Sequence, residues 1–241
     1  MPLLLFIVLM VTEPPFKETQ LKHARVKTAY DEKESVVKKY FSDKNLNYAS
    51  FHLFIRAFKK EQKLELWVNE KGKDTFSLLN TYDFCSSSGV LGPKRREGDA
   101  QIPEGVYEIN HFNPLSNYFL SLGVSYPNSS DKILSDKQHP GGSIYIHGNC
   151  VTIGCIPITD DKIKEVYVLA VEAKNNGQQK IPIHIFPSRL DDESFNELKR
   201  EYSSSETVIK FWGNLKTIYQ DFESSKKLKK VKVGSKGEYY F

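Results

Sequence analysis

The alternation of apolar and polar residues predicts a fold led by β-strands, with helices appended. From residue 51, the runs "FHLFIRAF" and "LELWV" are rich in β-forming residues and are separated by the charged turn "KKEQK". After a second turn, "NEKGK", the segment "TFSLLNTYDF" predicts a third strand, which makes residues 51–84 an antiparallel meander. Further strands are expected in "GVYEINHF", "SIYIHG" and "KIPIHIF". The pattern therefore favours the α+β class.

Helical spacing appears in three other places. The segment "ITDDKIKEVYVLAVEAKNNG" has apolar residues at helical intervals, Thr159 or Asp160 as an N-cap, and Gly177 as a left-handed stop. Residues 31–45 predict a short helix, with Val37 and Phe41 on its apolar side. Two last helices are expected over about 191–202 and 205–222.

These patterns divide the chain into five segments. Residues 1–20 hold the apolar run Leu3–Val11, which is too short to span a bilayer but suits the core of a secretory signal, followed by a linker. The polar stretch 12–30 extends this linker expectation. The remaining segments are a helical lead (21–50), a β-rich domain (51–187), C-terminal helices (188–222) and a basic tail (223–241).

The composition is that of a globular protein, with 27% charged and 39% hydrophobic residues. A net charge of +4 is too small to indicate nucleic-acid binding, although it is compatible with an anionic polymer or surface. The excess gathers in the segment "SSKKLKKVKVGSKGEYYF", which is expected to be a solvated tail.

The three cysteines indicate neither a disulfide framework nor a zinc site. Their odd number rules out complete pairing, and Cys85, Cys150 and Cys155 lack metal-site spacing. Cys85 is expected to be buried, and Cys150 to pack or to support its neighbours. A disulfide between Cys150 and Cys155 is a minor alternative that would act as a redox switch. No metal or organic cofactor is expected.

The segment "GGSIYIHGNCVTIGCIPITD" carries the candidate chemistry. His147 ends a predicted strand, and Cys155 follows eight residues later, just before a helix cap. A neighbouring imidazole or a helix N-terminus promotes the reactive thiolate of a cysteine. Gly154 permits a backbone shape that would direct the Cys155 amide at an attacked carbonyl. The alternative is a buried cysteine beside a structural histidine.

Two motifs resemble the L,D-transpeptidase catalytic domain family (YkuD-type). "IYIHGNCVTIGC" is similar to its histidine-glycine pair, His147-Gly148, followed by a [Ser/Thr]-x-Gly-Cys box, Thr152 to Cys155. "IPEGVY" resembles its Gly-[Thr/Ile]-Pro-x-Gly-x-[Phe/Tyr] strand entry. The resemblance covers about residues 51–187 and implies a mixed β-sheet or sandwich domain acting in the organisation of the cell wall and cell shape.

The chain departs from the usual pattern beside the cysteine. Ile153 stands where the family usually has a histidine, and Pro157 where an arginine is common. The interval between His147 and the box is also short. These features are similar to the YafK-like branch, some members of which are described as hydrolases that release proteins from peptidoglycan.

The resemblance implies a role for each matching residue. Cys155 would be the nucleophile that forms a thioester with a peptidoglycan stem peptide, and His147 the general base and acid. The Gly148 carbonyl would orient the imidazole, and the backbone amides of Gly154 and Cys155 would stabilise the oxyanion.

Other residues are candidates for substrate contact. Thr152 and Asn149 are expected to orient the loop, and Lys94, Arg95 and Arg96 to meet substrate carboxylates, with a solvated basic loop as the alternative.

The leading hypothesis is an exported L,D-transpeptidase of the periplasm or cell envelope, with peptidoglycan stem peptides as partners and peripheral association with the envelope. Hydrolysis of groups linked to peptidoglycan is the second hypothesis. A cysteine amidase or peptidase with other substrates and a non-catalytic wall-binding module are further alternatives.

Overall fold

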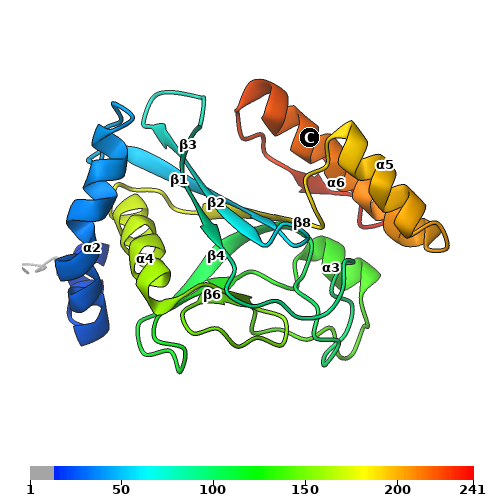
Figure 1. Cartoon of the computed structure of the whole chain (residues 1–241), viewed down its shortest axis with the longest axis horizontal. Coiled ribbons are helices and arrows are strands. Elements are labelled where there is room, and N and C mark those ends of the chain that lie inside the picture. Colours follow the sequence, from blue (N-terminus) through cyan, green and yellow to red (C-terminus); the bar gives the residue numbers. More distant parts are fainter. Residues whose placement is uncertain (1–13) are drawn as a thin grey trace, which may run out of the picture.

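The computed structural model describes residues 14–241 and contains one eight-stranded mixed sheet (Figure 1). The strand order is β3-β2-β1-β8-β4-β5-β6-β7. β1 pairs with β8, and β6 with β7, in parallel, and the remaining neighbours in the sheet are antiparallel. The predicted α+β, β-led class is confirmed. The bounds of the sheet strands are Phe51–Phe58 (β1), Lys63–Glu70 (β2), Ser77–Asp83 (β3), Gly105–Asn113 (β4), Ser121–Val124 (β5), Tyr145–His147 (β6), Ile156–Pro157 (β7) and Ile181–Phe186 (β8).

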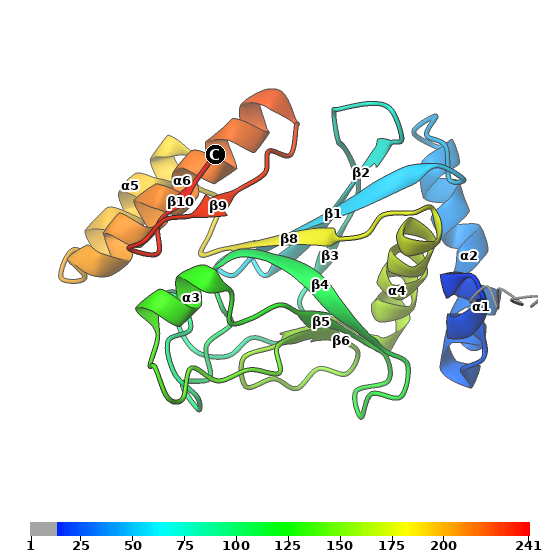
Figure 2. The same cartoon turned by 180° about the vertical axis from the view of Figure 1, so that it is seen from behind.

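Helices cover both faces of this sheet (Figures 1 and 2). On one side, α2 packs against α4, and on the other side lie α5 and α6. The helices are Phe16–Leu21 (α1), Ala24–Ser42 (α2), Ser129–Leu134 (α3), Asp160–Asn175 (α4), Asp192–Glu201 (α5) and Glu206–Ser225 (α6). Among residues 14–241, no helix is both long and apolar enough to cross a membrane.

Strand periodicity explains the two cores. Leu53, Ile55 and Ala57 of β1 face the cluster that includes α2 and α4, whereas Phe58 faces the cluster around Trp212 of α6. Because both faces of β1 are buried, almost all of its residues are apolar. His52, which is partly exposed, and Arg56 are the exceptions, and the buried Arg56 pairs with Glu65 and Glu223.

Helix α4 begins where its sequence predicts. The Thr159 side chain accepts a hydrogen bond from the Lys162 amide at 3.4 Å, and Asp160 and Asp161 occupy the first turn, where the positive end of the helix dipole favours acidic groups. The apolar side of α4 is completely buried against the sheet. This helix therefore fixes the end of the loop that carries Cys155.

Both ends of the described chain are more ordered than the polarity of their sequences suggests. The linker expected over residues 12–30 is wrong from Phe16 onward, because α1 and α2 pack against α4. The run Leu3–Val11 lies outside the described residues.

The basic tail is folded, although most of its lysines are exposed. Lys232–Val233 (β9) and Tyr239–Tyr240 (β10) form a hairpin, and Tyr239 is only 4% exposed. Asn214 of α6 bonds both the amide and the carbonyl of Tyr239, at 2.7 and 2.8 Å. This lysine-rich segment folds because the Tyr239 side chain packs into the apolar cluster that includes α6.

Candidate active site

His147 stands at the end of a short strand in the sheet interior. β6 is hydrogen-bonded to β5 on one side and to β7 on the other. Ser121 of β5 and Pro157 of β7 are the residues that pair with His147. His147 is only 1% exposed, so the sheet fixes both its backbone and the direction of its ring.

Two neighbours fix the imidazole of His147. Its Nδ1 lies 2.5 Å from the Gly148 carbonyl oxygen, the contact that the family resemblance implies. The Tyr118 ring lies against it, with ring centroids 4.6 Å apart and an interplanar angle of 31°. In neutral imidazole, an Nδ1–H that donates to the carbonyl leaves Nε2 with a lone pair. Nε2 is therefore the atom available to accept a proton.

Only glycine fits at position 148, because neighbouring atoms leave no room for a side chain. A Cβ atom at this position would lie 2.9 Å from the Tyr118 carbonyl oxygen and would also strike the Asp160 carboxylate. The same carboxylate accepts a hydrogen bond from the Asn149 amide at 2.7 Å. Asn149 has a φ of 63°, so the chain turns sharply just after His147. Asn149 thus shapes the loop through its backbone, and the start of α4 anchors it.

Extending the β6–β7 register by one residue places Cys155 on the side of the sheet that His147 faces. The β6–β7 register pairs Ile146 with Ile156, and one step back along both segments, just before β7 begins, places Cys155 beside Tyr145. Tyr145 and His147 share a face because side chains alternate along a strand. Among residues 14–241, no hydrogen bond joins the thiol to the imidazole, and the Cys155 Sγ instead lies 3.6 Å from the Ser143 carbonyl oxygen.

Burial keeps both groups uncharged. It raises the pKa of the Cys155 thiol, and a hydrogen bond from the Tyr145 backbone and the charge of Lys94 oppose this only in part. Burial also lowers the pKa of His147, against the hydrogen bond with Gly148. Both shifts favour the uncharged forms, a thiol and a neutral imidazole.

The Thr152 side chain accepts the hydrogen bonds of the two backbone amides that are predicted to form the oxyanion site. Its Oγ1 accepts hydrogen bonds from the Gly154 and Cys155 amides, at 3.2 and 2.8 Å, and donates to the Cys155 carbonyl at 2.9 Å. Gly154 has a φ of +130°, and a Cβ there would lie 2.9 Å from the Gln101 carbonyl oxygen. The turn thus needs glycine, and Thr152 organises it. The oxyanion role of the two amides stays a prediction, because the Thr152 hydroxyl would have to release them.

The remaining cysteines are bonded to each other. Cys85 and Cys150 form a disulfide across 65 residues, and Cys155 is a free thiol. The expectation that Cys85 is buried is wrong, because Cys85 is partly exposed. Packing of Cys150 and its bond to Cys155 are also wrong, because Cys150 is exposed and bonded to Cys85, and support of its neighbours stays a prediction. The disulfide ties the segment after β3 to the loop between His147 and Cys155.

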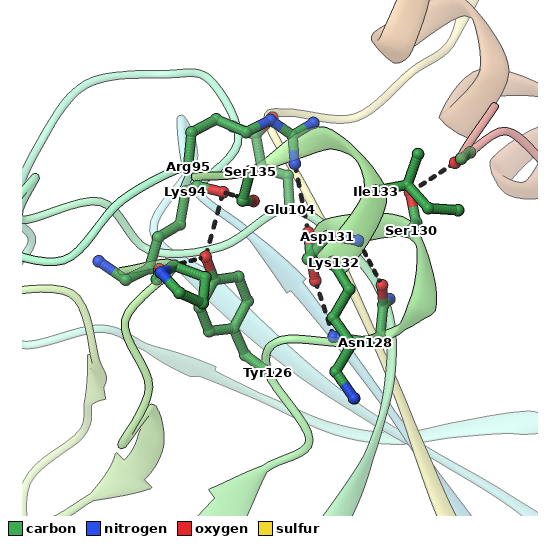
Figure 3. Close-up of polar contacts among 12 residues, drawn as sticks. Lys94, Arg95, Glu104, Tyr126, Asn128, Ser130, Asp131, Lys132, Ile133 and Ser135 are labelled. Atoms are coloured by element: carbon green, nitrogen blue, oxygen red, sulfur yellow. Dashed lines mark hydrogen bonds and ion pairs between the residues drawn. The ribbon is translucent and has the colours of Figure 1, made fainter. Parts of the chain in front are cut away.

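Two of the three basic residues in the long loop have partners inside the protein. Lys94 is buried and pairs with Asp99 at 2.6 Å, and Arg95 lies 3.3 Å from the Asp131 carboxylate (Figure 3). Arg96 is exposed. The charge of Lys94 also opposes, in small part, the rise that burial causes in the pKa of the Cys155 thiol. Contact of the three with substrate stays a prediction.

Three features of the site escaped the sequence argument. They are the Tyr118 ring on His147, the Ser143 carbonyl beside the thiol, and the disulfide. Each joins segments that are distant in sequence or contributes a backbone group, so no local pattern marks it. Within residues 14–241, no group of three or more His, Cys, Asp or Glu side chains is placed to hold a metal ion.

Comparison with known proteins places this geometry in context. Residues 53–185 match the L,D-transpeptidase catalytic domain family, YkuD. The chain is 35% identical over 183 residues to an Escherichia coli (strain K12) protein named "Putative L,D-transpeptidase YafK", covering 75% of this chain and 70% of that protein.

Solved structures are more distant. The helical cell shape determining protein Pgp2 from Campylobacter jejuni aligns with a TM-score of 0.45 and 20% identity, covering 82% of this chain and 80% of that one. Bd1075 from Bdellovibrio bacteriovorus aligns with a TM-score of 0.40 and 22% identity, over 73% of this chain and 64% of that one.

Proposed function

Because the chain belongs to the L,D-transpeptidase catalytic domain family, we propose that it is a cysteine acyltransferase that acts on peptidoglycan stem peptides through a thioester on Cys155. The observation that carries this proposal is the fixed His147 ring. Its Nδ1 is committed to the Gly148 carbonyl, which leaves Nε2 as the ring nitrogen that can take a proton.

The first half-reaction follows from these two side chains. The Cys155 Sγ attacks the carbonyl carbon of a stem-peptide amide while His147 Nε2 takes the thiol proton. The tetrahedral intermediate then collapses, the C–N bond breaks, and the imidazolium returns the proton to the departing amine. A thioester remains on Cys155. In the second half, an amine attacks the thioester, His147 takes its proton, and Cys155 leaves as the thiol.

The buried surroundings of His147 favour this order of reaction steps. The imidazole is a base throughout the neutral range because its pKa is lowered. The carbonyl of Gly148 stabilises the imidazolium that forms transiently, as the third member of a triad. Oxyanion stabilisation by the Gly154 and Cys155 amides requires the Thr152 hydroxyl to turn away when substrate binds, and Thr152→Val would remove that competitor.

Hydrolysis is the second candidate. Two positions beside the nucleophile offer no polar side chain to a peptide acceptor: Ile153 is 86% exposed, and Pro157 is buried in β7. An enzyme that holds its acceptor weakly leaves the thioester to water, which gives a free carboxylate as the product.

The decisive experiment uses purified muropeptides and intact-protein mass spectrometry. The wild-type protein and the Cys85→Ala/Cys150→Ala variant, which retains the nucleophile, should both gain the mass of an acyl group, and Cys155→Ala should not. Acylation of Cys155→Ala would refute the assignment.

Adding increasing concentrations of an amine acceptor distinguishes the two reactions. Cross-linked product should rise with acceptor for a transferase, whereas a product ratio that ignores the acceptor would identify a hydrolase.

The proposed place of action is the cell envelope, with the protein exported to the periplasm. Fractionation followed by mass measurement of the mature protein tests this. A protein found only in the cytosolic fraction, with residues 1–12 retained, would exclude export.

A further inference from the structure

A cavity of about 890 Å³, whose lining does not include Cys155, lies between the family domain and the C-terminal helices. One wall is the long loop around Gly92, and the opposite wall is the start of α6. Leu134 at the end of α3 and the β9–β10 turn close the remaining sides. α6 and the turn lie outside the residues 53–185 that match the family. The cavity is therefore built partly from segments that the family domain does not supply.

The cavity has a hydrocarbon lining. The apolar residues that contribute to it are Leu91, Pro93, Leu134, Val208 and Phe211. Phe211 is 9% exposed and forms part of the α6 core, whereas Leu134 is 41% exposed. The volume lies within the range of about 300–1,000 Å³ that small-molecule sites occupy.

Backbone groups in the walls are already bonded within the protein. The Gly92 amide donates to Glu104 at 2.7 Å, and its carbonyl accepts from Lys59 at 2.7 Å. The Gly237 carbonyl accepts a hydrogen bond from Ser130 and its amide donates to Gly234. A bound peptide would bury its own amides against hydrocarbon with few partners, at a cost that an alkyl chain does not incur.

Cations surround the cavity. Lys210 and Lys236 line it, are exposed, and have no ion-pair partner among residues 14–241. Arg95 also lines it, with its guanidinium 5.0 Å from the Phe211 ring centroid and beside Asp131 (Figure 3). Glu238 is the single acidic residue of the lining. The excess of positive charge favours an anionic head group.

We propose that this cavity binds a long-chain carboxylate, with its alkyl chain on the apolar lining and its head group between Lys210 and Lys236. This site is distinct from the thioester chemistry. The two sites share a border at Gln101, which lines the cavity and whose backbone carbonyl lies close to Gly154.

Calorimetric titration of the full chain with laurate, below the onset of micelle formation measured in the same buffer, tests the proposal. One laurate should bind per chain, and dodecyltrimethylammonium, with a similar chain but the opposite charge, should not. The Lys210→Glu/Lys236→Glu variant should bind laurate at least about tenfold more weakly, because two attractions become repulsions. Thr207→Trp, which adds an indole at an exposed lining position, should also weaken binding.

Matched controls keep the outcomes distinct. Lys230→Glu makes the same charge change at an exposed lysine that does not line the cavity, and should bind laurate as the wild type does. Cys155→Ala should also bind normally, so a failure of the proposed acyl transfer leaves this result intact. No binding of laurate, equal binding of the cationic chain, equal losses in Lys230→Glu and the double variant, or preference for an acidic peptide such as acetyl-Leu-Leu-Glu would overturn the proposal.

Discussion

Replacing Glu104 by Gln should destabilise the protein far more than an ordinary surface change. Glu104 is fully buried, and its carboxylate accepts hydrogen bonds from Lys59 at 2.8 Å, from the Gly92 amide at 2.7 Å and from the Trp212 indole at 2.7 Å. Gln has nearly the same shape, so no cavity forms. The change removes the negative charge and replaces one accepting oxygen with a donor.

The size of the destabilisation depends on the buried charge that Glu104→Gln leaves without a partner. In Glu104→Gln, the Lys59 ammonium stays buried with two carbonyl partners, those of Gly92 at 2.7 Å and Ile102 at 2.9 Å, and no opposite charge. Removing one partner of a buried pair costs about 3–5 kcal/mol. The Lys60–Glu197 pair is a matched control, because its side chains are 41% and 49% exposed at 3.3 Å and such pairs contribute less than about 1 kcal/mol.

Urea unfolding monitored by tryptophan fluorescence measures both effects. Glu104→Gln should lower the free energy of unfolding by about 3–5 kcal/mol, and Glu197→Gln by less than about 1 kcal/mol. Adding Lys59→Met to Glu104→Gln should restore part of the loss, because the uncompensated charge disappears. Equal losses in the two Gln variants, or a further loss on adding Lys59→Met, would refute the reasoning.

Three further predictions concern the site and its surroundings. His147→Ala should lower acylation by roughly two to four orders of magnitude and shift the residual pH profile upward, whereas His111→Ala should not; an unchanged rate would remove His147 from the mechanism. Because the pKa of Cys155 is raised, iodoacetamide should label one thiol per native chain slowly at neutral pH, with a rate still rising above pH 9; a plateau near neutrality would contradict this. Burial raises the pKa of Asp131 to about 6, so the folded state binds the extra proton and stability should fall as pH rises from about 4 to 6. Asp131→Asn should flatten that part of the stability profile, and an unaltered profile would show that another group titrates.

Local patterns were sufficient for much of the fold. The strands from Phe51 to Asp83 and helix α4 were anticipated because alternation, turns and the Thr159 cap are short-range signals. The sequence does not predict the two-residue strand β7, because this strand is defined only by its pairing with β6. The hairpin near Tyr239 was missed for a similar reason: its burial depends on Asn214 and on α6, which composition does not reveal.

The candidate site divides in the same way. His147, Gly148 and Cys155 are close in sequence, so spacing and motif could select them together. The cysteine pairing is non-local, and the bond between Cys85 and Cys150 joins positions 65 residues apart. The occupation of the Gly154 and Cys155 amides by Thr152 depends on one rotamer, which no sequence pattern determines.

The disulfide has a consequence for how the protein matures. Three cysteines allow three pairings, and only the bond between Cys85 and Cys150 leaves Cys155 reduced. Either of the other two pairings would consume Cys155, the residue that we propose as the nucleophile. Once Cys150 is joined to Cys85, no second thiol of the same chain remains to oxidise Cys155. In an oxidising compartment, this pairing would leave the thiol that we propose as the nucleophile free to meet substrate.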